Sequence, residues 1–125
     1  MENTDDLSVN GKKDVSGSIA WPGHVIGIAR LVERIDDLDR VTFNEGEILV
    51  TSNASPMLKK LMLRAGAIVV DEGGIGSHAA NIARELSKPT IIGTINETKV
   101  IKDGVMIEII ARSGEEVGKV LIIEK

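Results

Sequence analysis

The 125-residue chain contains no cysteine and no tyrosine, and its aromatic residues amount to only 2%. The lack of cysteine excludes a disulfide scaffold, a thiol nucleophile and a thiolate metal site, and it is consistent with a reducing cytoplasmic compartment. Proteins that bind single-stranded nucleic acid stack bases on aromatic side chains, and here only Trp21 and Phe43 are present. The composition therefore argues against that class of partner.

Positive charge and long apolar segments are also scarce. Lysine and arginine total 15 against 19 acidic residues, a formal net charge of −4, whereas binding to nucleic acid depends on clustered cations. No apolar run approaches the roughly 18 residues of a membrane helix, and the polar, acidic residues 1–6 do not resemble a signal peptide. We expect a soluble cytoplasmic protein that binds neither nucleic acid nor membranes.

The length and a hydrophobic content of 42% suit one globular domain with a single core and are too small for a multidomain enzyme. Residues 1–18 are mostly polar, with too few sizeable apolar side chains to fold independently. We therefore expect residues 1–18 to form a flexible N-terminal tail and residues 19–125 to form the folded domain.

Apolar patterning and β-branched residues predict strands at both ends of the domain and in its middle. The predicted strands are residues 25–32, 38–43, 48–51, 67–70, 90–93, 99–101, 105–110 and 117–123. Glycine-containing turns are predicted at Glu45-Gly46-Glu47, Asp103-Gly104 and Ser113-Gly114.

Two amphipathic helices are predicted between the central strands. The first spans residues 57–65, after an N-cap hydroxyl at Ser55 and a proline at position 56, with Gly66 just past its end. The second begins after residue 78 and ends before Lys88-Pro89. The resulting β-α-β-α-β region between flanking strands places the domain in the α/β class.

Three glycines, Gly73, Gly74 and Gly76, lie between a predicted strand and the second helix. They allow a sharp turn with uncovered amide groups, and the helix N-terminus adds partial positive charge, so this loop is a candidate anion site. Ser77 and His78 come directly after the last glycine. The helix field disfavours the imidazolium form, which would keep the His78 ring neutral and nucleophilic.

Other interpretations of this loop remain open. Residues 74–79 also match the dinucleotide fingerprint G-x-G-x-x-[GA], but the acidic residue expected about 20 positions on would fall near Thr94. A P-loop is excluded, because no Lys-Ser or Lys-Thr pair follows the glycines. A histidine at a helix start is also often a surface or capping residue, and loop glycines can serve packing alone.

The loop and the residues after it resemble the phosphohistidine mobile, or swivelling, domain of phosphoenolpyruvate-utilising enzymes. That family includes phosphoenolpyruvate synthase, pyruvate phosphate dikinase and enzyme I of the sugar phosphotransferase system. The resemblance is carried by residues 73–86, GGIGSHAANIAREL, and residues 89–94, PTIIGT. It continues through Trp21-Pro22-Gly23, residues 46–51, Ser55-Pro56, residues 65–71 and Asp103-Gly104.

The resemblance implies the β/β/α swivelling-domain fold, with a mixed sheet or barrel-like β core and two main helices. It also implies that His78 is the catalytic residue, phosphorylated transiently on its tele nitrogen, Nε2, and that it carries phosphate from a donor site to an acceptor site. The implied phosphate contacts are Gly73, Gly74, Gly76, Ser77 and Arg84.

The resemblance further implies partners, because the chain is too short to complete a phosphotransferase cycle alone. These are nucleotide-binding and phosphoenolpyruvate- or pyruvate-binding domains acting in trans, where Mg²⁺ and ATP or phosphoenolpyruvate are expected to bind. We expect no cofactor and no metal on this domain itself. The paired acids Asp71 and Glu72 are interpreted as a solvated turn, since two carboxylates make a weak Mg²⁺ site.

Two positions depart from the family pattern. Gly76 stands where the family usually has threonine, which predicts slower or absent phosphorylation and keeps open a non-phosphorylated binding or regulatory module of the same fold. Asn81 stands where an aliphatic residue is usual, and this departure should be tolerated if the side chain faces solvent or a partner. The other histidine, His24, follows Pro22-Gly23 in a predicted turn and is expected to be exposed and structural.

Overall fold

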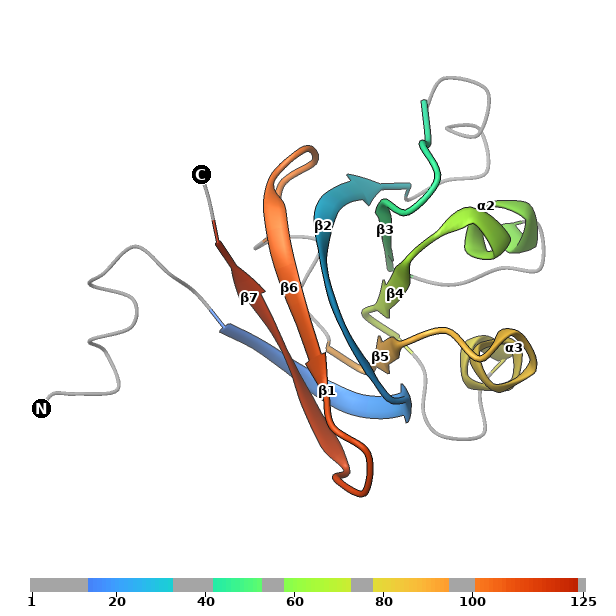
Figure 1. The fold of residues 1–125 in the computed structure, drawn as a ribbon, viewed down its shortest axis with the longest axis vertical. Helices are drawn as coiled ribbons and strands as arrows, with labels where there is room; N and C mark the ends of the chain where they lie inside the picture. The colour runs from blue at the N-terminus through green and yellow to red at the C-terminus, as the bar shows by residue number, and fades with distance from the viewer. Residues whose placement is uncertain (1–13, 33–41, 53–57, 73–77, 95–100, 124–125) are drawn as a thin grey trace, which may run out of the picture.

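The computed structural model describes residues 14–32, 42–52, 58–72, 78–94 and 101–123. Within these ranges the strands close into one barrel in the order β1-β5-β4-β3-β2-β6-β7, with two helices outside it (Figure 1). The α/β class, the barrel-like core and the two helices predicted from the sequence are confirmed. The elements are β1 (Asp14–Trp21), β2 (Gly23–Leu31), β3 (Ile48–Thr51), α2 (Lys59–Arg64), β4 (Ala67–Val70), α3 (His78–Leu86), β5 (Thr90–Ile92), β6 (Met106–Ala111) and β7 (Val117–Ile122).

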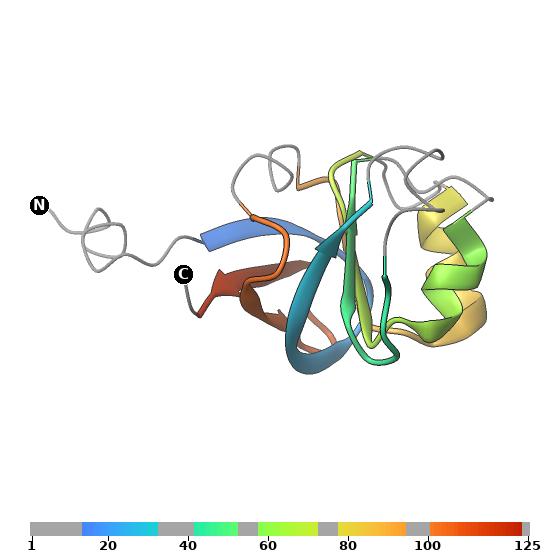
Figure 2. The ribbon, with the colours of Figure 1, turned by 90° about the horizontal axis from the view of Figure 1, so that it is seen from above.

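The barrel has a parallel half and an antiparallel half. Strands β2, β3, β4 and β5 are parallel neighbours, and the predicted alternation β3-α2-β4-α3-β5 is observed. Strands β1, β7, β6 and β2 pair antiparallel. Both helices lie over the parallel half, and β6 and β7 lie on the far side of the barrel from them (Figure 2).

Two apolar cores result from this arrangement. Alternate side chains fill the barrel interior, among them Ile48, Val69, Ile107, Ile109 and Val120. The opposite faces of the parallel strands pack against the helices and contribute Leu49, Ile68, Val70 and Ile92, which meet Met62 and Ile82. The short parallel strands are therefore buried on both faces, which explains their continuous apolar sequence.

The folded part begins earlier than predicted. Strand β1 starts at Asp14, so residues 14–18, predicted to belong to the tail, pair with β7 and β5; residues 1–13 lie outside the described residues. The sequence of this segment predicts no strand, because residues 14–18 include only one sizeable apolar side chain, Val15. Gly17 pairs with Gly118, and a Cβ at Gly17 would lie only 2.5 Å from the carbonyl oxygen of Ile92. Close approach of β1 to β5 therefore requires glycine at this position.

The predicted capping of the first helix was wrong at its C-terminal end. The cap residue Ala65 is extended, with φ −70° and ψ 147°, and Gly66 does not have positive φ. Gly66 instead allows close packing, because a Cβ there would lie 2.7 Å from the carbonyl oxygen of Gly46. Ser55 and Pro56 lie outside the described residues, as do most of the strands predicted at 38–43 and 99–101.

The predicted turns are confirmed, since Gly46, Gly104 and Gly114 all have φ near +90°. Such a conformation favours glycine, which has no Cβ to clash with the backbone. Gly114 lies in the turn that joins the antiparallel strands β6 and β7.

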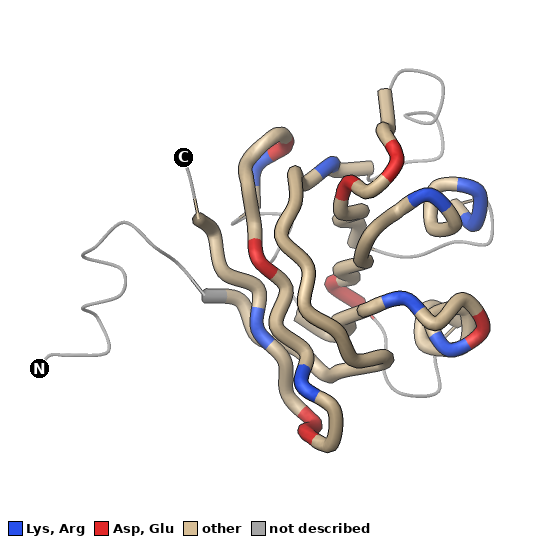
Figure 3. The backbone as a smooth tube through the Cα atoms, viewed as in Figure 1, with Lys and Arg blue, Asp and Glu red and all other residues tan. Residues whose placement is uncertain are grey.

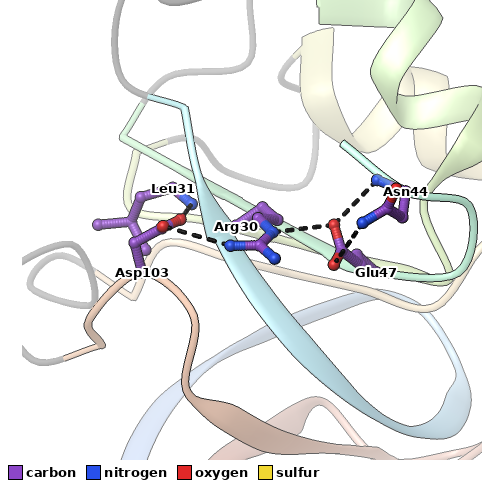
Figure 4. Close-up of polar contacts among 5 residues, drawn as sticks. All are labelled: Arg30, Leu31, Asn44, Glu47 and Asp103. Carbon is purple, nitrogen blue, oxygen red and sulfur yellow. Dashed lines mark hydrogen bonds and ion pairs between the residues drawn. The ribbon is translucent and has the colours of Figure 1, made fainter. Parts of the chain in front are cut away.

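Arg30 on β2 connects the turn that precedes β3 with the turn that precedes β6, through Glu47 and Asp103 (Figure 4). Glu47 Oε1 accepts hydrogen bonds from Arg30 Nε at 3.0 Å and from the Asn44 amide at 2.9 Å. Arg30 Nη1 also reaches Asp103 Oδ2 at 3.4 Å, and Asp103 Oδ1 accepts from the Leu31 amide at 2.9 Å. One guanidinium thus holds two turns against β2.

The Glu47 carboxyl is largely buried, at 11% exposed. Burial acts to raise its pKa, but the hydrogen bonds from Arg30 and Asn44 outweigh burial and hold the pKa below its ordinary value. The hydrogen bond to Glu47 in turn raises the pKa of Arg30. The ionised pair is therefore the form that stabilises the fold at neutral pH.

We expect Gly17→Ala to lower the free energy of unfolding by about 1–3 kcal/mol, because the new Cβ would overlap the backbone of β5. Gly27→Ala on β2 is the matched control. Its Cβ would make contacts of 3.4 Å or longer, so its effect should stay within about 1 kcal/mol. Urea unfolding measures both, and equal stabilities of the two variants would contradict the close approach inferred for β1.

We expect Glu47→Gln to destabilise the protein by roughly 1–2 kcal/mol at neutral pH. Because the folded state lowers the pKa of Glu47, its stabilising contribution is present above the ordinary pKa of glutamate and is lost as the pH falls through the lowered value. The difference between wild type and variant should therefore shrink on acidification. Urea unfolding across the acidic range tests this, with Glu45→Gln at a neighbouring exposed position as a control that should change stability little at neutral pH.

Candidate functional site

The carboxyl ends of the parallel strands meet at one edge of the barrel and carry buried polar side chains. Thr51 ends β3, Asp71 follows β4 and Thr94 follows β5 by two residues. These residues are 0%, 6% and 8% exposed. In α/β sheets the carboxyl edge is where ligands bind, because the connections to the helices leave from it.

Asp71 and Thr94 are bonded directly across this edge. Thr94 Oγ1 donates to Asp71 Oδ1 at 3.0 Å and also lies 3.3 Å from the carbonyl oxygen of Val70. The Asp71 amide donates to the carbonyl oxygen of Thr51 at 3.1 Å. The sequence-based interpretation of Asp71 as part of a solvated turn was therefore wrong. The adjacent Glu72 is exposed, as expected.

His78 is the first residue of α3, and α3 begins eight positions after Val70, the last residue of β4. Its side chain is exposed, whereas Ala79, Ala80, Ile82 and Ala83 on the same helix are buried. The buried positions fix the helix against the sheet, so the ring is held on a rigid element and stays accessible to another molecule. Partial positive charge at the helix N-terminus favours an anion near this position.

The remaining predicted contacts are only partly described. Gly73, Gly74, Gly76 and Ser77 lie outside the described residues, so their contact with phosphate stays a prediction. Arg84 is exposed on α3, and its Nη2 donates to Asn81 Oδ1 at 2.6 Å. Asn81 is itself exposed, which is the condition under which this departure from the family pattern should be tolerated.

His24 lies at the opposite edge of the barrel, because it is near the start of β2, which runs parallel to β3. Its side chain is 62% exposed, as expected, and Nε2 lies 2.5 Å from Glu108 Oε2. Both residues line an open cavity of about 540 Å³ together with Pro22 and Arg112. The two histidines of the chain are therefore on opposite edges of the barrel and do not form one site.

Among the described residues, no group of three or more histidine, cysteine or acidic side chains is placed to hold a metal ion. None of the helices in the described part of the chain is long and apolar enough to cross a membrane.

Residues 43–114, more than half of the chain, match the family model described as PEP-utilising enzyme, mobile domain. The chain belongs to this family of mobile domains. The matched segment contains the central β3-α2-β4-α3-β5 region, including His78, and β6 of the hairpin after it.

The mobile domain is similar to segments of several phosphoenolpyruvate synthases. It is 44% identical over 95 residues to a probable phosphoenolpyruvate synthase of Staphylothermus marinus, covering 76% of this chain and 11% of that protein. The phosphoenolpyruvate synthase of Pyrococcus furiosus is 43% identical over 97 residues, with the same two coverages. A probable phosphoenolpyruvate synthase of Methanothermobacter thermautotrophicus is 36% identical over 114 residues, covering 90% of this chain and 16% of that protein. The mobile domain thus spans less than a fifth of each relative.

Two solved structures share the fold. Aconitase X of Thermococcus kodakaraensis has a TM-score of 0.61 at 21% identity, covering 90% of this chain and 99% of that chain. Muramoyltetrapeptide carboxypeptidase of Oxalobacter formigenes has a TM-score of 0.60 at 14% identity, covering 94% and 52%. Proteins with such different names share this architecture, so function has to be argued from the site.

The hydrogen bond between Thr94 and Asp71 is the part of the site that was not predicted from the sequence. The signal was present in the sequence, since each residue follows a short apolar run that was predicted as a buried strand. Polar side chains that directly follow neighbouring parallel strands lie at the same edge and can pair there.

We expect Thr94→Val to lower the free energy of unfolding by about 1–3 kcal/mol, because the buried Asp71 carboxylate loses a hydroxyl donor. Thr94→Ser keeps the hydroxyl and should cost less. Urea unfolding of the two variants measures the difference. A serine variant no more stable than the valine variant would contradict the assigned role of the hydroxyl.

Proposed function

We propose that this mobile domain is a phosphoryl carrier that is transiently phosphorylated on His78. The observation that carries the proposal is the placement of this exposed side chain at the first position of α3, on a helix anchored by buried residues. Membership of the mobile-domain family and similarity to phosphoenolpyruvate synthases support it.

The chemistry requires two balanced transfers. In the first, the neutral His78 ring attacks the donor phosphorus through Nε2; an N–P bond forms, and the donor P–O bond breaks with its electron pair leaving on the donor oxygen. In the second, an acceptor oxygen attacks the same phosphorus, and the N–P electron pair returns to the ring. The N-terminus of α3 favours the negative charge of the bound phosphoryl group in both steps. Ser77, the loop glycines and Arg84 are proposed as additional contacts.

The donor and acceptor sites belong to other domains in this proposal. The chain spans between 11% and 16% of the relatives named above, so it corresponds to one part of a much longer enzyme. We propose nucleotide-binding and phosphoenolpyruvate- or pyruvate-binding domains as its partners, with Mg²⁺ held on those partners. The carrier therefore completes a phosphotransferase cycle only together with them.

A second candidate is a non-phosphorylated binding or regulatory module of the same fold. It is favoured by Gly76, which lacks the hydroxyl that the family usually provides two residues before the histidine. The dinucleotide-binding alternative is not supported by the fold, because the sheet of the described residues closes into a barrel and leaves no second βαβ half.

Phosphorylation is tested by incubating the full chain with phosphoenolpyruvate or ATP and Mg²⁺ together with a phosphoenolpyruvate synthase, followed by intact mass measurement. We expect one phosphoryl adduct that is lost in mild acid and stable in base, since protonation makes the imidazole a good leaving group. His78→Ala should abolish the adduct. His24→Ala should keep it, because His24 is also exposed but lies at the opposite edge.

The controls separate the candidates. An adduct that persists in His78→Ala would overturn the assignment of the phosphorylated residue. A wild-type chain that binds the synthase but acquires no adduct with either donor would favour the non-phosphorylated module.

A further inference from the structure

The exposed side chains of the two helices form one continuous surface that begins at His78. On α3, His78, Asn81 and Glu85 follow one another at intervals of three and four positions, so they lie on one side of the helix. On α2, Lys59 and Leu63 are four positions apart and share its exposed side. Lys59 Nζ donates to Glu85 Oε2 at 3.5 Å and joins the two rows. We call the exposed residues of both helices the helical face: Lys59, Lys60, Leu63, Arg64, His78, Asn81, Arg84 and Glu85.

The helical face is fixed by packing and by a bond between the helical segments. Met62 on α2 and Ile82 on α3 are buried in the same apolar core. Lys88, two residues past the end of α3, donates through Nζ to the carbonyl oxygens of Leu63 and Ala65 at 2.5 Å each. This lysine therefore ties the C-terminal end of α2 to the segment after α3. A preformed surface loses little conformational entropy when a partner binds.

The helical face has a charge opposite to that of the rest of the chain. It contains a single acid, Glu85, and four cations: Lys59, Lys60, Arg64 and Arg84 (Figure 3). Its formal charge is +3 in a chain of net charge −4, so the residues outside the face sum to −7. Surfaces that need only to be solvated mix both signs, whereas segregated charge attracts a partner of the opposite sign. The imbalance therefore indicates an acidic partner.

Two of the cations and one apolar side chain are open to such a partner. Within the described part of the chain, the side chains of Lys60 and Arg64 make no hydrogen bond or ion pair. Leu63 lies three positions after Lys60 and directly before Arg64, and it is 51% exposed. An apolar centre with a polar rim is the composition of a protein–protein interface. Leucine gains little against a phosphate backbone, so Leu63 favours an acidic protein surface over a nucleic acid.

The position of His78 within the helical face indicates which protein this is. A phosphoryl donor has to bring its phosphorus within bonding distance of the His78 ring. The protein that holds the donor then comes against the side chains next to that ring, and Asn81 is one helical turn away on the same side of α3. From Asn81 the row continues through Glu85 and Lys59 to Leu63. A protein that serves His78 therefore approaches along the helical face.

The size of the helical face sets the kind of contact. Helices of 6 and 9 residues, rising about 1.5 Å per residue and about 10 Å wide, cover on the order of 200 Å² in projection. A standard stable interface buries about 800 Å² per partner. The helical face is therefore too small to hold a lasting complex. Its charge instead speeds the encounter, which suits a carrier that has to leave its donor after each transfer.

We propose that the helical face is the surface on which the chain docks to an acidic surface of its phosphoryl donor protein. Lys60 and Arg64 face carboxylates of that protein, and Leu63 is covered by it. The contact is transient and presents His78 to the donor site. This inference rests on the proposed function, since it names the surface through which the carrier meets its donor.

Docking is tested without phosphorylation by using the full chain with His78→Ala. Its affinity for a phosphoenolpyruvate synthase is measured by surface plasmon resonance at several salt concentrations. We expect the affinity to fall with rising salt, and Lys60→Glu combined with Arg64→Glu to weaken it by at least about tenfold and to flatten the salt dependence.

The matched control is Lys102→Glu combined with Arg112→Glu. It changes the net charge by the same amount, at exposed positions in the turns before and after β6. We expect its affinity to stay within about twofold of that of the parent chain, because steering depends on where the charge lies as well as on its sum. Circular dichroism of both double variants shows that they are folded.

The rate of adduct formation on chains that retain His78 separates this inference from the proposed function. An adduct that forms at an unchanged rate in the Lys60→Glu, Arg64→Glu variant, with unchanged binding, would overturn the docking surface and leave the carrier standing. Binding that this variant loses, with no adduct from either donor, would support the docking surface and refute the carrier. A chain that does not bind the synthase at any salt concentration would overturn the docking surface, as would a variant that loses binding to a DNA duplex instead of to the synthase.

Discussion

Closure of the sheet through β1 is the constraint on which the rest of this structure depends. β1 is the strand that joins the two halves, since it pairs with β5 of the parallel half and with β7 of the antiparallel half. The space it occupies is so narrow that Gly17 and Gly118 face each other, and a Cβ at either position would collide with neighbouring atoms. Two residues without side chains therefore allow one continuous barrel in place of two separate sheets.

The closed barrel determines where the reacting side chain can lie. With the interior filled by aliphatic residues, the helices can pack only on the outside of the parallel strands. The connection from β4 to α3 then leaves the carboxyl edge at Asp71, which accepts a hydrogen bond from Thr94, two residues past the end of β5. His78 is accessible to other molecules because it begins the helix, and its position is fixed because the next residues are buried. Accessibility and rigidity in one side chain are what a group carrier needs.

Much of this arrangement could be predicted from the sequence where short-range signals agree with the tertiary structure. The central strands are apolar runs, and the buried residues of α3 lie on one side of the helix. The order of these strands and helices was therefore predictable. β1 was not, because the close approach that requires Gly17 arises from a strand over 70 residues away. The same holds for Gly66, whose neighbour Gly46 is distant in sequence, and for Asp71, which accepts a hydrogen bond from the distant Thr94. The predictions that failed all concern long-range contacts.

The division of the barrel into two halves also separates two kinds of surface. On the parallel half the helices cover the outward side chains of the strands. The exposed His78 lies at the carboxyl edge of this half. On the antiparallel half the outward side chains of β2, β6 and β7 are uncovered by any described element, yet several are aliphatic, including Ile26. The helical face and these strands lie on different sides of the barrel, and the helical face is the one that contains His78. A partner that reaches His78 therefore meets the exposed side chains of the helices, and their positive charge governs how it approaches.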